Sequence, residues 1–446
     1  MKTTTPWRDA CVLSTLAVAE LVCARWAASV ISRDTTYLYY VGGFLAMALC
    51  WLAGSYFVMT HARDTRANRL IIVSAAIAMR ALMLPTDPTL SDDIFRYVWD
   101  GRVQHAGINP YVFAPDAEAL VPLREDATAE PNIFAGINNK EIPTIYPPFM
   151  QIAFFAVTAL SEDIVWMKAM FVGADLAIIL VLAKLLGSLG LHRTRVLLYA
   201  WSPLVIFEVA GSGHNDALAV LALMAALLAI VHHRSHLTMA LMTLSGLGKL
   251  LGFALMPLLA RAVPRRSFVV VPAVTAALSW PYLGAGGLAF VGITEYGTRW
   301  RGNDGLFHIL FAVTGSLDAA KLVVAVVLIA LVVALVSLDA NPLRSSYLTV
   351  GAVLLLMPTV HPWYLLWIAP FLAIYPSPAW LFLTTSIVLG YHSAYLSMPG
   401  QPWEDVSWVK LLEYAPFFAL AGASLRRRAH GGRQACREFL GLESRP

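Results

Sequence analysis

The sequence is short of charged residues and of cysteine. Charged residues make up 13% of the 446 residues, against about 25% in a typical soluble domain, and hydrophobic residues make up 58%. This balance excludes an ordinary soluble protein. The cysteines lie in apolar runs or in the basic C-terminal stretch, so they predict neither a disulfide framework nor redox chemistry: Cys11, Cys23, Cys50 and Cys436. Glycine and proline are scattered among the apolar runs, which excludes a disordered or collagen-like chain.

The sequence also lacks the motifs of several enzyme classes. It contains no glycine-rich phosphate loop followed by Lys-Ser or Lys-Thr, no Gly-x-Ser-x-Gly and no His-Glu-x-x-His. Chemistry driven by a soluble nucleotide is therefore unsupported, and a lipid-borne donor is the natural choice for a site at the outer membrane face. The net charge of +4 comes from short basic clusters between apolar segments, which indicates membrane topology and not nucleic-acid binding.

Long apolar runs predict an all-α, polytopic membrane protein, because a helix needs about 20 apolar residues to cross the lipid core. The first run is interrupted by Glu20 and Arg25 and no clear cleavage site follows it, so we expect a retained helix and not a signal peptide. We expect about 12 spans, near 11–31, 37–59, 69–85, 164–187, 196–210, 215–231, 267–283, 318–338, 345–360, 362–376, 378–395 and 408–424.

Basic clusters set the predicted orientation, since short cytoplasmic loops are rich in Lys and Arg. Placing every cluster in the cytoplasm requires two segments to enter and leave the membrane on one side. We expect these re-entrant hairpins at 147–161 and 236–260, the second broken at 246–249, and a cavity beside such irregular backbone. The clusters are Arg63/Arg66/Arg69, Arg193/Arg195, Arg261/Arg265/Arg266 and Arg426/Arg427/Arg428 with Arg433.

The predicted topology divides the chain into four parts and leaves both termini in the cytoplasm. Residues 1–85 form N-terminal membrane helices, 86–145 a long outer loop, 146–425 a transmembrane core and 426–446 a basic tail. Further outer segments are expected at 284–304 and 396–407. The loop 86–145 holds 10 acidic residues together with Trp, Tyr, Phe and Ile, so we expect ordered short helices on the membrane surface.

Asp92 and Asp93, at the start of this outer loop, are the candidate catalytic residues. Ser91 and Asp92 fit a helix N-cap, where a side-chain oxygen accepts hydrogen bonds from free backbone N–H groups. Alternatively, adjacent carboxylates raise each other's pKa toward that of a general base, and Arg96, one turn along, can pair with only one of them. The residue types alone leave both interpretations open.

Other polar motifs have structural and functional interpretations too. Asn-Pro within 107–111 predicts a tight turn, and Tyr146 begins a stiff entry into the first hairpin. His214 and Asp216 lack the spacing and third ligand of a zinc site. They bind a polar ligand, or the next helix is capped through Asn215 or Asp216. Four basic groups could bind phosphate or anchor the chain at the interface: Lys249, Arg299, Arg301 and His361.

Several of these strings resemble one enzyme superfamily. They are Asp-Asp-Ile-Phe-Arg-Tyr-Val-Trp-Asp-Gly-Arg, Gly-Ile-Asn-Pro-Tyr, Thr-Ile-Tyr-Pro-Pro, Trp-Ser-Pro-Leu, Gly-His-Asn-Asp and His-Pro-Trp-Tyr, between about Asp92 and Pro370. Together they resemble the bacterial polyprenyl-phosphate-sugar-dependent glycosyltransferases of superfamily C (GT-C), in particular the mannosyltransferase and glycosyltransferase family 87-like group. The resemblance implies a GT-C-like fold and a hexosyltransferase, with mannose the first choice, in the bacterial cytoplasmic (inner) membrane. In many GT-C enzymes the acidic loop follows the first span, whereas three predicted spans precede it here.

The resemblance also implies a reaction. A polyprenyl-phosphate sugar would be the donor and a glycan or glycolipid the acceptor, with Asp92 or Asp93 deprotonating the acceptor for an inverting attack. Such a donor carries about one negative charge, so a basic residue can stabilise the leaving phosphate and neither a metal nor another cofactor is expected. Arg96 would hold the acidic pair in place. The expected substrate-binding residues are Arg96, Tyr146, His214, Asp216, Lys249, Arg299, Arg301 and His361.

A transporter or flippase for a lipid-linked or polar solute is the alternative class. Broken hairpins and charged residues near the membrane also occur in transporters. The sequence shows no internal repeat, however, and its acidic residues concentrate in an outer loop and not at mid-membrane. These two features favour the enzyme.

Overall fold

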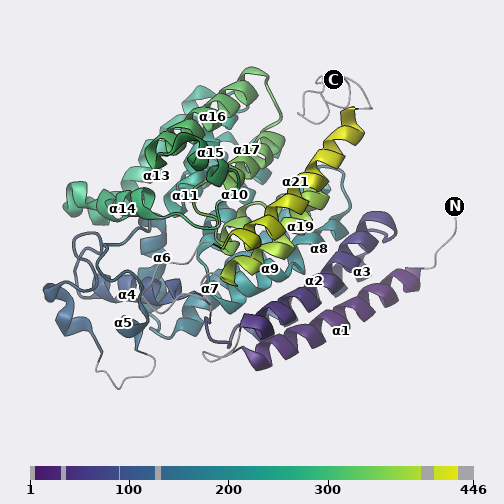
Figure 1. Cartoon of the computed structure of the whole chain (residues 1–446), viewed down its shortest axis with the longest axis horizontal. Coiled ribbons are helices and arrows are strands. Elements are labelled where there is room, and N and C mark those ends of the chain that lie inside the picture. The colour runs from purple at the N-terminus through teal and green to yellow at the C-terminus, as the bar shows by residue number, and fades with distance from the viewer. Residues whose placement is uncertain (1–5, 32–36, 90, 126–131, 393–405, 430–446) are drawn as a thin grey trace.

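The structure, a computed structural model, describes residues 6–31, 37–89, 91–125, 132–392 and 406–429, and these fold mainly into helices (Figure 1). Within these ranges the strand-like contacts amount to one isolated bridge between Gly302 and Thr359. The predicted all-α class is therefore confirmed. The predicted outer stretch 396–407 lies almost wholly outside the described residues, as do Cys436 and most of the basic tail.

Five described helical segments are long and apolar enough to cross a membrane, and four more are shorter but apolar. The long ones are Trp7–Val30, Tyr37–Thr60, Ile164–Ser188, Arg265–Arg299 and Leu317–Ser337. The shorter ones are Pro148–Thr158, Asp216–Val231, Pro342–Leu356 and Pro378–Gly390. The membrane character is thus supported, whereas the number of about 12 spans stays a prediction.

Three helices begin the chain: α1 (Pro6–Val30), α2 (Tyr37–Thr60) and α3 (Arg66–Met83). α1 packs on both of the others, and the group lies away from α4 and α5 (Figure 1). α3 begins after Thr65, whose side chain accepts a hydrogen bond from the N–H of Asn68 as an N-cap. Three helices therefore do precede the outer loop.

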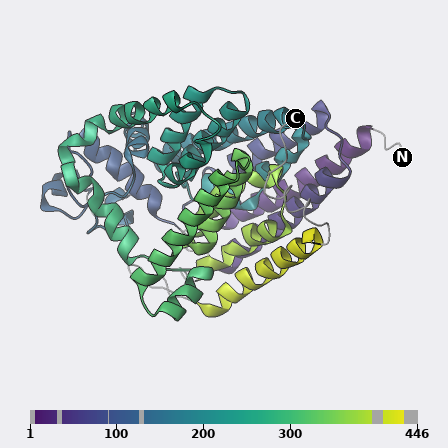
Figure 2. The ribbon, with the colours of Figure 1, turned by 90° about the horizontal axis from the view of Figure 1, so that it is seen from above.

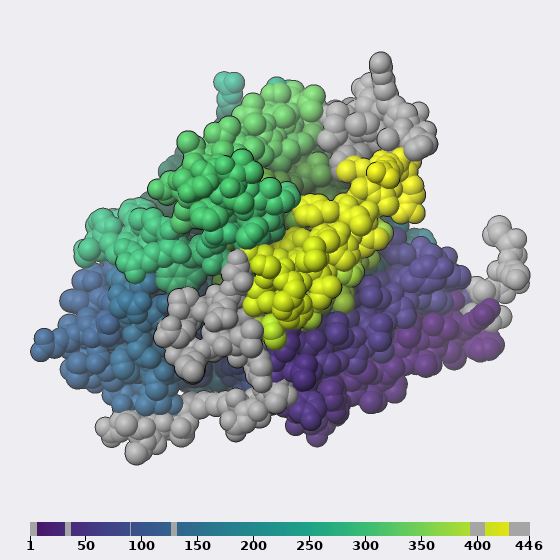
Figure 3. Space-filling view, in the orientation of Figure 1, coloured from purple at the N-terminus to yellow at the C-terminus, as the bar shows by residue number. Residues whose placement is uncertain are grey.

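The segment 86–145, predicted as the outer loop, contains short helices as expected: α4 (Asp93–His105), η1 (Glu118–Leu123) and α5 (Ile133–Gly136). α4 packs against α6 (Pro148–Thr158) and α7 (Ile164–Ser188), so the segment is in contact with the core. Figure 3 shows the blue surface of this part of the chain at one end of the molecule, with the purple N-terminal helices at the other.

The predicted span 196–210 is not one helix, and that prediction is wrong. The chain instead forms η2 (Arg193–Val196), α8 (Leu197–Ala200), α9 (Pro203–Val205) and the π-helix η3 (Ile206–Gly211) before α10 (Asp216–Val231). Pro203 lacks a backbone N–H and disfavours helical backbone in the preceding residue, so the helix restarts there. Single-turn π segments inside helical regions often occur at functional sites.

The two predicted hairpins have different outcomes. The segment 236–260 is broken where predicted, because α11 (Ser235–Gly248) ends before an extended Lys249, and α12 (Leu251–Leu255) and η4 (Met256–Leu259) follow. Gly252 lies so close to α11 that a Cβ there would sit 2.4 Å from the backbone nitrogen of Gly246. By contrast, 147–161 contains one short helix, α6, and no second helical limb.

The remaining helices form the C-terminal half, where two further predictions fail. Residues 284–304, expected as an outer loop, are largely helical, and the expected span 362–376 is not one helix, because the chain turns at 368–370, which contains Pro370, between the helical segments 362–367 and 371–374. Figure 2 shows α21, in yellow, along one edge of the molecule, where it packs on α19. The helices are η5 (Arg265–Val269), α13 (Val270–Ser279), η6 (Trp280–Phe290), α14 (Val291–Arg299), α15 (Leu306–Thr314), α16 (Leu317–Ser337), α17 (Pro342–Leu356), η7 (Pro362–Trp367), α18 (Phe371–Ile374), α19 (Pro378–Ser386), η8 (Ile387–Gly390) and α21 (Ser407–Ala429).

Candidate active site

The acidic pair lies at the N-terminus of α4. Asp92 occupies the N-cap position, yet its side chain makes no capping hydrogen bond and accepts one from the Asn138 amide instead. Ser91 takes the capping role in part, because its hydroxyl accepts from the N–H of Asp93 at 3.4 Å. The interpretation that the Asp92 side chain caps α4 is therefore wrong, and neither carboxylate is used in capping the helix.

Asp93 has the acid–base properties of a general base. Burial and, next, the neighbouring Asp92 carboxylate raise its pKa to about 6, against the opposing effect of the Lys249 ammonium. Desolvation also raises the pKa of Asp92, against the stabilising hydrogen bond from Asn138. A base that titrates just below neutral pH is charged under working conditions and still accepts a proton readily.

A tight turn after η3 brings His214 to Asp93. Gly213 adopts a φ of 77°, which L-residues disfavour, and the N–H of His214 donates to the carbonyl of Glu208 at 2.9 Å. The imidazole is 1% exposed, with Nδ1 3.8 Å from Oδ2 of Asp93 and Nε2 3.3 Å from Oε2 of Glu208. Burial, with help from Lys249 and His361, lowers the pKa of His214, so the ring rests in its neutral form.

Aromatic stacking fixes the two histidines of the site. The His214 ring stacks on Trp363 at 4.0 Å between centroids, and the His361 ring stacks on the same indole at 4.4 Å. Burial and the Lys249 charge lower the pKa of His361 to about 3, so His361 is neutral as well. Trp363 thus joins two turns that lie about 150 residues apart in the sequence.

Lys249 supplies the positive charge of the site. The residue lies at the break after α11, and its side chain is 25% exposed. Its Nζ donates to Oδ2 of Asp216 at 2.8 Å. Nε1 of Trp367 donates to Oδ1 of Asp216 at 2.8 Å, which holds the carboxylate from its other side. The ammonium also lies 5.3 Å from the centroid of Tyr364, whose hydroxyl is hydrogen-bonded to that of Tyr296. Asp216 therefore positions Lys249 and does not cap α10.

The side chain of Asn215 makes no capping hydrogen bond either. Asn215 is the N-cap residue of α10 and is fully buried, yet neither its Nδ2 nor its Oδ1 has a hydrogen-bond partner within the described residues. The prediction that Asn215 or Asp216 caps this helix is therefore wrong. Tyr146, in contrast, does lie beside the acidic pair, since burial and the Asp93 carboxylate raise the pKa of its phenol.

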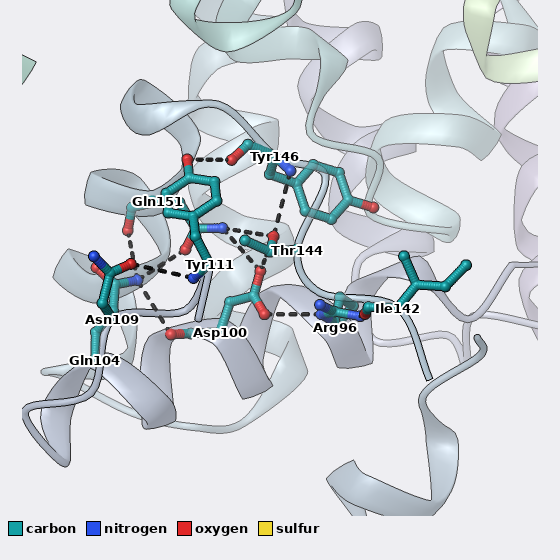
Figure 4. Close-up of polar contacts among 9 residues, drawn as sticks. All are labelled: Arg96, Asp100, Gln104, Asn109, Tyr111, Ile142, Thr144, Tyr146 and Gln151. Atoms are coloured by element: carbon teal, nitrogen blue, oxygen red, sulfur yellow. Dashed lines mark hydrogen bonds and ion pairs between the residues drawn. The ribbon is translucent and has the colours of Figure 1, made fainter. Parts of the chain in front are cut away.

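Arg96 does not contact the acidic pair, so that prediction is wrong. Its Nε donates to Oδ1 of Asp100 at 2.8 Å and its NH1 to the carbonyl of Ile142 at 3.0 Å (Figure 4). Asp100 also accepts hydrogen bonds from Thr144 and Gln151, at 2.5 and 2.8 Å. This network ties α4 to α6 and to the loop 142–146, and it holds the acidic end of α4 in place.

A tight turn next to this network confirms the prediction for 107–111. Oδ1 of Asn109 accepts from the N–H of Tyr111 at 3.1 Å, and the Tyr111 hydroxyl donates to the carbonyl of Tyr146 at 2.7 Å (Figure 4). The Asn-Pro motif is thus structural, and it supports the backbone that carries Tyr146.

The two other predicted basic residues have partners elsewhere. Arg299 forms an exposed ion pair with Glu295, one turn away on α14. Arg301 donates to Oδ2 of Asp304 at 2.7 Å, and Lys410 of α21 binds the same buried carboxylate. Among the predicted phosphate-binding groups, therefore, Lys249 and His361 lie together with Asp93, and Arg299 and Arg301 are committed to other carboxylates.

Glu208 is the site residue that the sequence analysis missed. It lies in the π-helix η3, is 1% exposed, and accepts a hydrogen bond from Tyr391 at 2.8 Å besides facing His214. Its signal was present in the sequence, since an acidic residue in an otherwise apolar stretch is rare without a function. Across the described residues, no group of three or more His, Cys, Asp or Glu side chains has the arrangement of a metal site.

These features define a helical membrane protein in which an aspartate faces a buried histidine beside a half-buried, ion-paired lysine. A family model described as the N-terminal domain of alpha-(1->6)-mannopyranosyltransferases of the MptA/MptB family matches residues 9–265, and a model of the MptB C-terminal domain matches residues 308–427. The chain belongs to this family of alpha-(1->6)-mannopyranosyltransferases and is a mannosyltransferase. No curated protein sequence matches the chain.

The family assignment confirms the predicted enzyme class and decides against the transporter alternative. The N-terminal match contains Asp92, Asp93, His214 and Lys249, and the C-terminal match contributes His361. The site is therefore built from both matched parts of the chain.

Proposed function

We propose that this mannosyltransferase uses polyprenyl-phosphate mannose as donor and a glycan or glycolipid as acceptor, at the outer face of the bacterial cytoplasmic membrane. The observation that carries the proposal is that Asp93, a base with a pKa of about 6, lies within the electrostatic reach of the Lys249 cation, which the Asp216 carboxylate holds at 2.8 Å. A base beside a cation is what a hydroxyl attacking a phosphate-linked sugar requires. By analogy with the family description, the new bond is α-(1→6).

In this mechanism Asp93 takes the proton from the acceptor hydroxyl, whose oxygen attacks the anomeric carbon of mannose while polyprenyl phosphate leaves. Asp92, held by Asn138, orients the acceptor and keeps the pKa of Asp93 raised. Direct displacement inverts the anomeric centre, so an α-linked product calls for a β-linked donor. The leaving group is a monophosphate, and a single cation can stabilise it without a divalent metal.

Lys249 is the best candidate for the phosphate contact. An ammonium has three donors, and the bond to Asp216 uses one of them, which leaves others for a phosphate oxygen. Arg299 and Arg301 are paired with carboxylates away from Asp93, and His361 is neutral. The opposing role of Lys249 in the pKa of Asp93 supports a phosphate position next to the base.

The arrangement of the chain supports the orientation. The beginning of α1 and the end of α21 lie on the side of the molecule away from α4 and α5 (Figure 1). Both described ends are thus remote from the acidic pair, as expected if the termini are cytoplasmic and the site faces outward.

Release of polyprenyl phosphate tests the function. Purified full-length protein receives polyprenyl-phosphate mannose, glucose or a pentose with envelope glycolipid, and Asp93→Asn protein is assayed alongside. We expect release with the mannose donor, dependent on acceptor and abolished by Asp93→Asn. Equal release by wild type and variant, or release with a nucleotide-linked mannose only, would overturn the proposal.

A further inference from the structure

A buried chain of three ionisable groups runs inward from the acidic pair. Oδ2 of Asp93 lies 3.8 Å from Nδ1 of His214, and Nε2 of the same ring lies 3.3 Å from Oε2 of Glu208. His214 and Glu208 are each 1% exposed, whereas the Asp93 side chain is 25% exposed. The chain therefore leads from the solvent-reachable base into the closed interior.

The His214 imidazole, the middle group of the three, is placed where it can transfer a proton. Within the described residues neither ring nitrogen has a hydrogen-bond partner of good geometry, although the ring is buried and each nitrogen faces a carboxylate. A buried polar group left in this state costs free energy, and such groups in native proteins call for an explanation. Catalytic hydrogen bonds are often long before substrate binds and tighten in the complex.

The backbone around Glu208 is also unusual. Glu208 lies in the π-helix η3, and the turn that follows needs the positive φ of Gly213 to bring His214 back to the Glu208 carbonyl. Single-turn π segments often occur at functional sites. Together, the π segment and this turn bring Nε2 of His214 to 3.3 Å from Oε2 of Glu208.

We propose that Asp93, His214 and Glu208 form a proton relay that carries the acceptor's proton inward, with Glu208 as its final acceptor. The inference rests on the proposed role of Asp93 as the base. In the reactive form Asp93 and Glu208 are carboxylates and His214 carries its proton on Nε2; burial raises the pKa of Glu208 to about 8, so this form becomes more populated as the pH rises toward that value. The acceptor O–H bond breaks and an Asp93 O–H bond forms, while the electron pair of the sugar–phosphate bond leaves with polyprenyl phosphate.

The second step returns Asp93 to its carboxylate form, and once the product has left, the proton returns from Glu208 through His214 and Asp93 to solvent. The Asp93 proton passes to Nδ1 of His214 as the Nε2 proton passes to Glu208, so that Asp93 is again a carboxylate, the imidazole is neutral and Glu208 is a carboxylic acid. The charges around the ring favour this outcome: Lys249 and His361 disfavour a lasting imidazolium, and Tyr391 holds Glu208 in position. Asp92 and Asp216 are the other charged groups near Asp93.

The relay is tested with two substitutions that separate charge from shape. Glu208→Gln keeps the volume and removes the proton acceptor, whereas Glu208→Asp keeps the carboxylate and shortens the side chain. A relay predicts that kcat falls about 100-fold in Glu208→Gln, with KM for the donor within threefold, and that Glu208→Asp retains more activity than Glu208→Gln. A packing role predicts the reverse order, because Gln is the closer fit, and that result would overturn the relay.

The pH profile gives a second readout that packing would not move. Because burial raises the pKa of Glu208 to about 8, the relay predicts that kcat rises through about pH 8 in the wild type, as Glu208 becomes a carboxylate, and that this rise is absent in Glu208→Gln. The same rise in Glu208→Gln would contradict the relay. Glu413→Gln is the matched control, since Glu413 is equally buried and also holds one side-chain donor, Asn303, outside the relay. Loss of the wild-type reaction itself would count against the proposed function and not against the relay.

Discussion

Two aspartates of one helix, Asp93 and Asp100, have opposite surroundings. Asp100 is 1% exposed and accepts hydrogen bonds from Arg96, Thr144 and Gln151. Asp93, about two turns earlier, has a second carboxylate beside it and its nearest basic nitrogen, on His214, at 3.8 Å. Both groups are acidic, but Asp100 is the more buried of the two and three side chains donate hydrogen bonds to it. Asp100 therefore ties α4 to α6, whereas burial and the Asp92 carboxylate give Asp93 a raised pKa.

The largest effect should come from removing the reactive carboxylate. Asp93→Asn keeps the shape of the side chain and loses the base, so we expect kcat to fall by about 1000-fold. Unfolding of the purified protein should be unchanged, since Asp93 carries no stabilising ion pair. The measurement is single-turnover transfer with thermal unfolding in the same detergent. Retention of more than a tenth of the activity would assign the base elsewhere, with Asp92→Asn the next variant to assay.

The matched change at the other aspartate should act on stability. Asp100→Asn leaves the buried Arg96 guanidinium without its anionic partner, so we expect a loss of about 3 kcal/mol in the free energy of unfolding. Activity per folded molecule should stay within tenfold of wild type. Unfolding midpoints and activity normalised to folded protein measure the two effects. A variant that unfolds like wild type would show that the network in Figure 4 does not support α4.

The pH dependence sharpens the contrast further. Asp93 works as a carboxylate, and its raised pKa of about 6 means that kcat/KM should fall about tenfold for each pH unit below that value. Lys249→Met removes a charge that lowers this pKa, so the acid limb should move to higher pH. Asp92→Asn removes a charge that raises it, so the limb should move to lower pH. Shifts of the same sign in both variants would exclude Asp93 as the titrating group.

The smallest effect is expected at Arg299. Its ion pair with Glu295 is exposed, and such pairs contribute little because water screens them. We expect Arg299→Ala to change kcat and KM for the donor by less than twofold, whereas a phosphate-binding arginine would raise KM clearly. Steady-state kinetics beside Lys249→Met checks this, and a large rise in KM for Arg299→Ala would move the phosphate site to α14.

Part of the fold and of the candidate site could be predicted from local sequence. Adjacent aspartates after an apolar run mark the start of an outer helix, and glycines followed by lysine predict the break at the end of α11. The partner of Arg96 could not be predicted, because Asp92, Asp93 and Asp100 all lie within about one turn of it on α4. Packing of α4 against α6 buries the face that carries Asp100, and that contact between distant segments decides the pairing.

By itself the sequence determined that this protein is a helical membrane protein with 10 of its 28 acidic residues in the polar segment 86–145, since hydropathy and charge act locally along the chain. The tertiary structure alone decided which of the polar groups meet. Trp363 stacks between His214 and His361, Lys249 reaches Asp216, and Glu208 turns toward His214 through a π-helix. Each of these contacts depends on distant segments or on irregular backbone, which the periodicity of the sequence does not predict. Their geometry depends on how the broken helices pack.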